Sequence, residues 1–277
     1  MVVFIRKASE NIHVLEVVFF RNLLAFIVIL PIIKSIGIKA IKMNNPKLFF
    51  IRGFFGAIGM LAGFTCLTLI PLAQATAISF SKPIFITVGA TIFLGEIIKL
   101  RRIAAIIIGF AGMLIIVQPG IDSFSIGITL AIIAAIAHSM NALIVKKLTL
   151  TESPHSIIIW MVIILIPITL VPATQVWEWP NIETWIYLWG IAILGTGAHF
   201  LFTKSYSMAE ITSLQPIEFI KLPIMALIGW IIFYEIPGVW TWVGGLIIFI
   251  STIYISHREA KDTNSLKPNE GIQEPKL

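Results

Sequence analysis

Long apolar runs separated by short polar breaks dominate the hydrophobic pattern of this sequence. Most runs are about 20 residues long, the length that a helix needs to cross the hydrocarbon core of a bilayer. They lack the roughly ten-residue alternation of a membrane β-barrel, and lipid leaves an irregular backbone without hydrogen bonds. The pattern therefore predicts nine full membrane-spanning helices, over residues 14–33, 48–69, 72–94, 103–118, 126–145, 156–176, 183–203, 209–233 and 238–256.

The composition supports a membrane protein over a soluble one. Hydrophobic residues make up 58% of the 277 residues and charged residues only 12%, whereas soluble domains carry about 25% charged residues. So few charges cannot cover a water-facing surface, which argues against soluble enzymes and nucleic-acid binders. The single cysteine, Cys66, excludes an internal disulfide and a cysteine-based metal site. The sequence implies no cofactor and no metal.

The distribution of cations predicts the orientation of the chain. Lys and Arg gather in alternate loops, including residues 34–52, 99–102 and 146–147, and in the polar tail. Because cationic loops stay on the cytoplasmic side, we expect a multi-pass protein of the bacterial inner membrane with its C-terminus in the cytoplasm. Topology thus explains the net charge of +6 without a nucleic-acid partner. The tail, residues 257–277, is too polar to bury a core and is expected to be disordered.

The sequence repeats itself with an offset of 139–140 residues. Lys82 aligns with Lys221, and Glu96 aligns with Glu235. Each repeat holds five spans, and an odd number means that the second copy is inverted in the membrane. The sequence therefore predicts an all-α, ten-helix membrane fold with a first repeat at 1–118 and a second at 126–256.

The first helix of this design is largely missing from the sequence. Only five residues precede Arg6, whereas a complete span precedes its counterpart Lys146. We therefore expect the first repeat to be truncated at its N-terminus by roughly 15–25 residues. The alternative is a nine-span protein with a short interfacial stub.

Two inverted five-helix repeats resemble the drug/metabolite transporter superfamily with two EamA-type domains. The resemblance extends from residue 1 to about 256 and rests on the span order, on Phe19–Asn22, and on a proline, an apolar run and a glutamate, as in Pro83…Glu96 and Pro223…Glu235. Within the superfamily, Leu15–Pro31 and Pro71–Phe85 are similar to S-adenosylmethionine uptake carriers of intracellular bacteria. The resemblance implies a small-molecule transporter rather than an enzyme.

Two lysines near the bilayer centre are the first candidates for substrate contact. An ionisable group at this depth is costly and points to function, and the repeat makes Lys82 and Lys221 counterparts. They would bind a carboxylate or phosphate; the alternative is a permanent pair with an internal carboxylate. Glu218 shares a helix face with Lys221 and would neutralise it or couple transport to protons.

The remaining candidates have both a functional and a structural interpretation. Arg21 needs a partner, for which Glu16 or Glu218 are candidates, and Asn22 is expected to face elsewhere. His138 and Asn141, one turn apart, would relay protons or form a neutral core pair. Trp160 would stack on an adenine or pack on a neighbouring helix. The predicted substrate-binding residues are Arg21, Lys82, His138, Asn141, Trp160, Glu218 and Lys221.

Other polar and small residues are assigned to structure. His199 is read as structural, and Glu96 and Glu235 are expected to cap neighbouring helices at the membrane edge. Gly53, Gly56, Gly59 and Gly63 recur at helical spacing and predict close helix packing.

The leading hypothesis is a secondary carrier for a small polar metabolite. It would work by alternating access. Because no nucleotide-hydrolysing motif occurs in the sequence, transport would be driven by a proton gradient or by counter-exchange of another metabolite, and not directly by ATP. The central site would be lined by spans 14–33, 72–94, 126–145, 156–176 and 209–233. S-adenosylmethionine is one candidate, although the cations fit only its amino-acid end; amino acids, nucleotide-like compounds and riboflavin-like vitamins are others.

Two alternatives stay open. One is a proton-coupled exporter of amino acids or drugs, in which Glu218 would matter most. The other is a membrane-embedded enzyme, for which His138 with Ser139 and His199 with Ser205 lack any supporting motif. The oligomeric state is left open.

Overall fold

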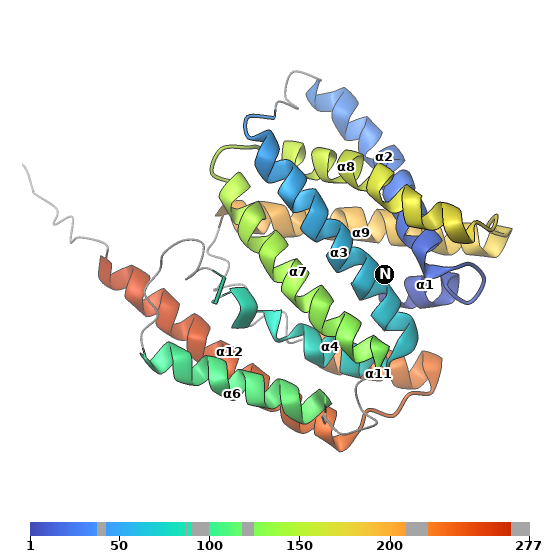
Figure 1. The fold of residues 1–277 in the computed structure, drawn as a ribbon. Helices are drawn as coiled ribbons and strands as arrows, with labels where there is room; N and C mark the ends of the chain where they lie inside the picture. The colour runs from blue at the N-terminus through green and yellow to red at the C-terminus, as the bar shows by residue number, and fades with distance from the viewer. Residues whose placement is uncertain are drawn as a thin grey trace, which may run out of the picture.

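The computed structural model describes residues 1–37, 43–82, 84–86, 88–89, 100–117, 125–208 and 221–266. These residues form helices joined by short turns and contain no strand (Figure 1). The helices are α1 (Val2–Ala8), α2 (Val14–Ile36), α3 (Pro46–Leu69), α4 (Leu72–Ser79), α6 (Leu100–Val117), α7 (Ile126–Leu148), α8 (Pro154–Ala173), α9 (Ile182–Met208), α11 (Lys221–Phe233) and α12 (Val239–Leu266), with a short 3₁₀ turn, η2 (Thr174–Val176).

Polar side chains mark the starts of α7 and α8. Ser125 caps α7 by accepting a hydrogen bond from the Ile128 N–H at 3.3 Å. Ser153 caps α8 in the same way, accepting from the Ser156 N–H at 3.1 Å. Each cap satisfies one of the backbone donors that a helix leaves open at its first turn. The short polar breaks in the hydrophobic pattern therefore set where these spans begin.

Five helices in the described part of the chain are long and apolar enough to cross a membrane. They occupy Val14–Ser35, Pro46–Leu69, Ile126–Leu148, Pro154–Val176 and Ile182–Met208, and each matches an expected span. Three other expected spans contain shorter apolar helices, over Ile107–Ile116, Ile224–Phe233 and Val239–Ser251.

The expected span 72–94 is interrupted near its middle. Helix α4 ends at Ser79, and Phe80 and Ser81 form a turn in which the Phe80 N–H donates to the carbonyl three residues back at 3.2 Å. Pro83 has no N–H, so the Ser79 carbonyl lacks its helical donor. A continuous helix was therefore the wrong expectation here. The break lies directly before Lys82, and interrupted helices are common at the binding sites of transporters.

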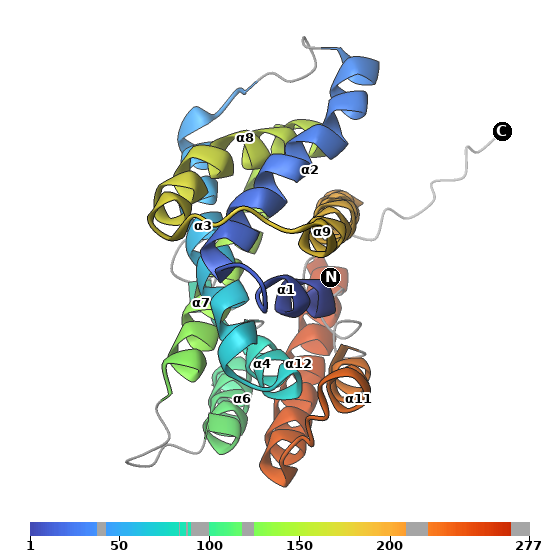
Figure 2. The same ribbon diagram turned by 90° about the vertical axis from the view of Figure 1, so that its right-hand side faces the viewer.

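The helices pair across the two repeats as a pseudo-twofold axis requires. α2 packs on α8, α4 on α11 and α6 on α12, and each pair joins equivalent helices of the two repeats. The contact between α3 and α7 has its counterpart between α9 and α1. Figures 1 and 2 show α6 and α12 side by side at one end of the molecule, with α2 and α8 at the other.

Two buried carboxylates fasten the repeats to each other. Glu16, at the start of α2, accepts a hydrogen bond from the Glu178 N–H at 2.7 Å. Glu152, between α7 and α8, accepts from the N–H groups of Asn44 and Asn45 at 2.8 and 3.1 Å. In each case a carboxylate at or just before the second helix of one repeat satisfies backbone donors just before the third helix of the other.

Glycines let helices approach closely, as the sequence predicted. A Cβ atom on Gly53 would overlap the side chain of Ile164, and one on Gly56 would lie 3.8 Å from Leu165, so both glycines face α8. A Cβ on Gly112 of α6 would lie 2.9 Å from the Gly244 carbonyl oxygen of α12. Backbones therefore meet with no side chain between them at that crossing.

Helix α12 extends further than expected. It continues to Leu266, so the first ten residues of the tail, 257–266, are helical rather than disordered. Extending an existing helix adds a hydrogen bond per residue without a new nucleation step. The segment also contains Glu259, Ala260 and Lys261, which are good helix formers.

Candidate functional site

Two adjoining cavities lie between the repeats. Cavity A has a volume of about 300 Å³ and extends along α4 past Thr76 and Ser79. Cavity B has a volume of about 330 Å³ and is bounded by α3, α7 and α9. Lys82, His138 and Lys221 line both cavities, so three of the predicted site residues meet where the two cavities adjoin.

Lys82 and Lys221 approach the cavities from equivalent positions in the two repeats. Lys82 follows the break after α4, and its carbonyl accepts a hydrogen bond from the Ser139 hydroxyl at 3.1 Å. Lys221 begins α11, and its ammonium lies 5.2 Å from the centre of the Phe202 ring, within cation–π range. The inverted repeat thus places one lysine on each side of the same space.

His138 and Asn141 share the face of α7 that lines cavity B. The imidazole of His138 packs against Gly59, where a Cβ atom would lie 3.0 Å from its Cε1 and Nδ1 atoms. The buried amide oxygen of Asn141 has no hydrogen-bond partner among the described residues. The pair therefore combines a titratable side chain, His138, that packs against the backbone of α3, and a buried hydrogen-bond acceptor, the amide oxygen of Asn141.

Arg21 is placed differently from expectation. Its side chain is 0% exposed, and its Nη1 donates to the Asn22 oxygen at 2.7 Å. The expectation that Asn22 faces elsewhere was wrong, because the long arginine side chain curls back to its neighbour. Glu16 is not its partner, since that carboxylate binds backbone N–H groups. The Nε–Nη2 edge of Arg21 instead lies against Gly195 of α9.

Two other candidates lie outside the cavities or outside the described structure. Trp160 packs on an apolar cluster that includes Phe49 and Ile164, and it is not among the residues that line cavity A or cavity B. This position agrees with the packing interpretation. Glu218 and Glu96 lie outside the described residues.

Sequence analysis missed the role of Arg52. It was counted among the cytoplasmic loop cations, yet it lies within α3, is 2% exposed and lines cavity B. Its Nη1 donates to the Ile157 carbonyl at 3.1 Å, and its Nη2 donates to the Met161 sulfur at 3.2 Å. The available signal was its position four residues inside the span predicted at 48–69.

The helices that line the cavities also differ from expectation. α3 and α9 contribute Arg52 and His199, whereas no residue of α2 or α8 lines either cavity. α2 and α8 pack on each other instead, with Phe20, Leu24 and Val162 in one apolar cluster. His199, which was read as structural, therefore lies at cavity B.

The site carries positive charge. Among the described residues that line cavities A and B, none is Asp or Glu. In the described part of the chain, no group of three or more His, Cys, Asp or Glu residues could hold a metal ion. The cavities are therefore suited to bind a polar ligand that carries a negative charge.

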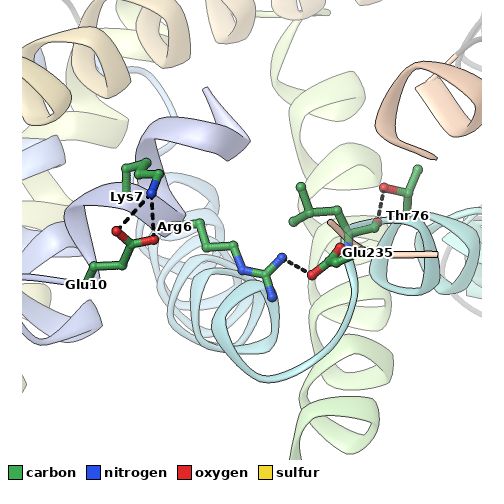
Figure 3. Close-up of polar contacts among 6 residues, drawn as sticks. Arg6, Lys7, Glu10, Thr76 and Glu235 are labelled. Atoms are coloured by element: carbon green, nitrogen blue, oxygen red, sulfur yellow. Dashed lines mark hydrogen bonds and ion pairs between the residues drawn. The ribbon is translucent and has the colours of Figure 1, made fainter. Parts of the chain in front are cut away.

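An ion pair also joins the two repeats. The Arg6 guanidinium of α1 contacts the Glu235 carboxylate, which follows α11 (Figure 3). The other oxygen of Glu235 accepts a hydrogen bond from the Leu72 N–H at 2.9 Å, at the start of α4. The prediction that Glu235 caps a neighbouring helix is therefore confirmed.

Comparison with known proteins agrees with this architecture. The chain is 31% identical to a riboflavin transporter of Vibrio cholerae over 86% of its length and 81% of that protein. It is also 31% identical to the S-adenosylmethionine uptake transporter of Rickettsia bellii, over 91% and 87% of the two chains. A pseudopaline exporter of Pseudomonas aeruginosa is 24% identical over 91% and 89%.

Structure and family comparisons agree with each other. A protein of known crystal structure shares the fold with a TM-score of 0.67 at 14% identity, over 93% of each chain. The EamA-like transporter family matches the sequence twice, over residues 1–118 and again over residues 125–257. The two matching halves, together with helices that pair across the repeats, identify this multi-pass inner-membrane protein as a member of the EamA-like transporter family.

Proposed function

We propose that this protein is a secondary carrier that moves a small polar metabolite by alternating access, with S-adenosylmethionine uptake as its leading activity. One observation carries the proposal: Lys82 and Lys221, equivalent in the two repeats, line the same pair of adjoining cavities. The S-adenosylmethionine uptake transporter of Rickettsia bellii supports the choice of substrate. The C-terminus lies in the cytoplasm, as the distribution of cations favours.

The two lysines would bind the substrate in alternate access states. When inverted repeats rock about a central site, equivalent residues exchange environments between the two access states. Lys82 and Lys221 would each contact the anionic end of the substrate, and His138 and Asn141 would contact its polar groups. In this proposal, Arg21 contributes positive charge beside cavity B. Trp160 would act only through helix packing.

Export coupled to protons is the second candidate function. It is favoured by the similarity to the pseudopaline exporter and would use Glu218 as the proton-binding carboxylate. In this case Glu218→Gln abolishes export of the substrate, whereas Lys82→Ala leaves export measurable.

Uptake of labelled S-adenosylmethionine tests the leading proposal. The chain is expressed in a bacterial host that lacks such a carrier, and uptake is followed with Lys82→Ala, Lys221→Ala and Gly197→Ala. We expect saturable uptake that falls to the level of the empty host in both lysine variants. Gly197→Ala should keep it, because a Cβ atom there meets nothing within 4 Å.

Two outcomes would count against the proposal. Absence of uptake, with the protein verified in the membrane, would remove S-adenosylmethionine as the substrate; labelled riboflavin would then be measured in the same cells. Full uptake by both lysine variants would remove the assigned role of Lys82 and Lys221.

A further inference from the structure

Arg52, which lines cavity B, has one N–H donor that is not used in a hydrogen bond to the described residues. Both of its Nη atoms are occupied, by the Ile157 carbonyl and the Met161 sulfur. These two contacts fix the plane of the guanidinium group. Its buried Nε has no hydrogen-bond partner among the described residues. A charged donor that is held rigidly and left unpaired inside a membrane protein calls for an acceptor.

Arg21 adds a second donor edge nearby. Its Nη1 is bound to Asn22, but its Nε and Nη2 are buried with no hydrogen-bond partner in the described part of the chain. Nε and Nη2 form one edge of the guanidinium plane, the fork that fits two oxygens of a carboxylate or phosphate. The edge lies against Gly195, and Gly195 lines cavity B.

The electrostatics of this region favour an anion. Burying two guanidinium groups is costly, and the cost is offset only by a countercharge or by a full set of acceptors. The described residues that line cavity B supply the cations Arg52, Lys82 and Lys221, but neither Asp nor Glu. An oxyanion of the transported molecule would provide the missing charge.

We infer that the Nε of Arg52, together with the Nε–Nη2 edge of Arg21, forms a subsite for an oxyanion of the transported metabolite. The inference rests on the proposed transport function and narrows it. The substrate carries a carboxylate or a phosphate, which this subsite selects over neutral analogues. Arg52 contacts the oxyanion from the wall of cavity B, and the edge of Arg21 contacts it beside Gly195.

Isothermal titration calorimetry of the purified protein in detergent measures binding and tells whether the oxyanion is a carboxylate or a phosphate. One pair of probes is S-adenosylmethionine and its decarboxylated form, which differ in a carboxylate. The other pair is riboflavin 5′-phosphate and riboflavin, which differ in a phosphate. We expect the wild-type protein to bind the oxyanion-bearing member of one pair about tenfold or more tightly than its counterpart.

Two sets of variants connect this preference to the arginines. Arg52→Gln should remove the preference while leaving the weaker member of the pair bound as before, and Arg52→Lys should restore only part of it. Gly195→Ala places a methyl group 3.3 and 3.4 Å from Nη2 and Nε of Arg21 and should reduce the preference in a protein with all charges intact. Gly197→Ala, on the same helix, should not reduce it.

The outcomes distinguish this inference from the transport proposal. Equal binding of both members of each pair by the wild-type protein overturns the subsite alone. The subsite is also overturned if Arg52→Gln weakens both members equally, as a purely structural role of Arg52 would require. If no probe binds and no uptake is measured, both the subsite and the proposed substrates are overturned.

Discussion

Arg21 and Asn22 illustrate how far a long side chain can depart from helix geometry. Neighbouring positions on a helix point in different directions, yet the guanidinium group of Arg21 reaches the Asn22 oxygen at 2.7 Å. Asn22 in turn donates to the Val18 carbonyl at 3.0 Å. A buried arginine takes whichever acceptors its reach allows, because an unmet donor in an apolar environment costs about 1–3 kcal/mol or more.

Gly59 fixes the position of His138, and this gives a prediction at the scale of a residue. Gly59→Ala places a methyl group 3.0 Å from the imidazole, so the ring must move away from its position at the cavities. We expect the rate of substrate uptake to fall several-fold with little change in the amount of protein in the membrane. Uptake by intact cells, normalised to protein, measures the effect.

Gly56→Ala is the matched control for Gly59→Ala. It adds the same methyl group to the same helix, but at an ordinary contact distance of 3.8 Å from Leu165. Equal uptake by the two variants would show that the position of His138 does not matter for transport.

At the scale of an element, the apolar pattern predicts the length of a membrane span well, but it does not predict whether the helix within that span is continuous. The run of residues 72–94 has the length of a span, but α4 stops at Ser79. Pro83 removes a backbone donor, and the Ser81 hydroxyl donates to the Ile78 carbonyl at 2.7 Å. These local signals could have suggested the break from sequence. The packing of α4 on α11 was not predicted, although the repeat had already made Lys82 and Lys221 counterparts at a shared site.

The crossing of α6 and α12 gives a prediction at this scale. Gly112→Ala places a methyl group 2.9 Å from the Gly244 carbonyl oxygen, and a backbone atom cannot rotate away as a side chain can. The two helices must separate, so we expect a loss of about 1–3 kcal/mol in stability. The melting temperature of the purified protein in detergent measures the loss.

Gly197→Ala again serves as the comparison, because its new methyl group meets nothing within 4 Å. An unchanged melting temperature for Gly112→Ala would mean that the contact of α6 with α12 contributes little to the stability of the protein.

At the scale of the whole molecule, single contacts between distant parts of the chain join the two repeats. Arg6 and Glu235 are 229 residues apart in sequence, and Glu235 also receives the Leu72 N–H. Figure 3 shows this carboxylate between α1 and the start of α4. Because inverted repeats move relative to each other during transport, a contact of this kind stabilises one arrangement of the repeats over another.

Glu235→Gln tests the effect of this ion pair on access to cavity A. The amide keeps an oxygen for the Leu72 N–H but loses the charge that binds Arg6. We expect a shift of about 1 kcal/mol, roughly fivefold, toward the state open on the Arg6 side. Cys66 is the only cysteine in the sequence and lines cavity A, so its rate of labelling by a membrane-impermeant maleimide reports the shift.

Lys7→Gln is the control for this measurement. Lys7 pairs with Glu10 at 3.0 Å within the same repeat and lies 5.8 Å from the centre of the Phe233 ring in the second repeat, near the limit of cation–π contact. Its loss therefore weakens the contact between the repeats less than the loss of the Arg6–Glu235 ion pair does. If Glu235→Gln and Lys7→Gln leave Cys66 labelling equally slow, the contact of Arg6 with Glu235 does not control access.

The sequence by itself determined the membrane class, the positions of most spans, the two repeats and the equivalence of Lys82 with Lys221. These features follow from the length of the apolar runs and from the charges within them. Both are properties of residues that are close together in the sequence. Only the tertiary structure placed Arg52 and His199 at the cavities and moved α2 and α8 away from them. A helix in lipid is apolar on its buried and exposed faces alike. Its sequence therefore does not tell which face meets the cavity, and contacts between the repeats decide it.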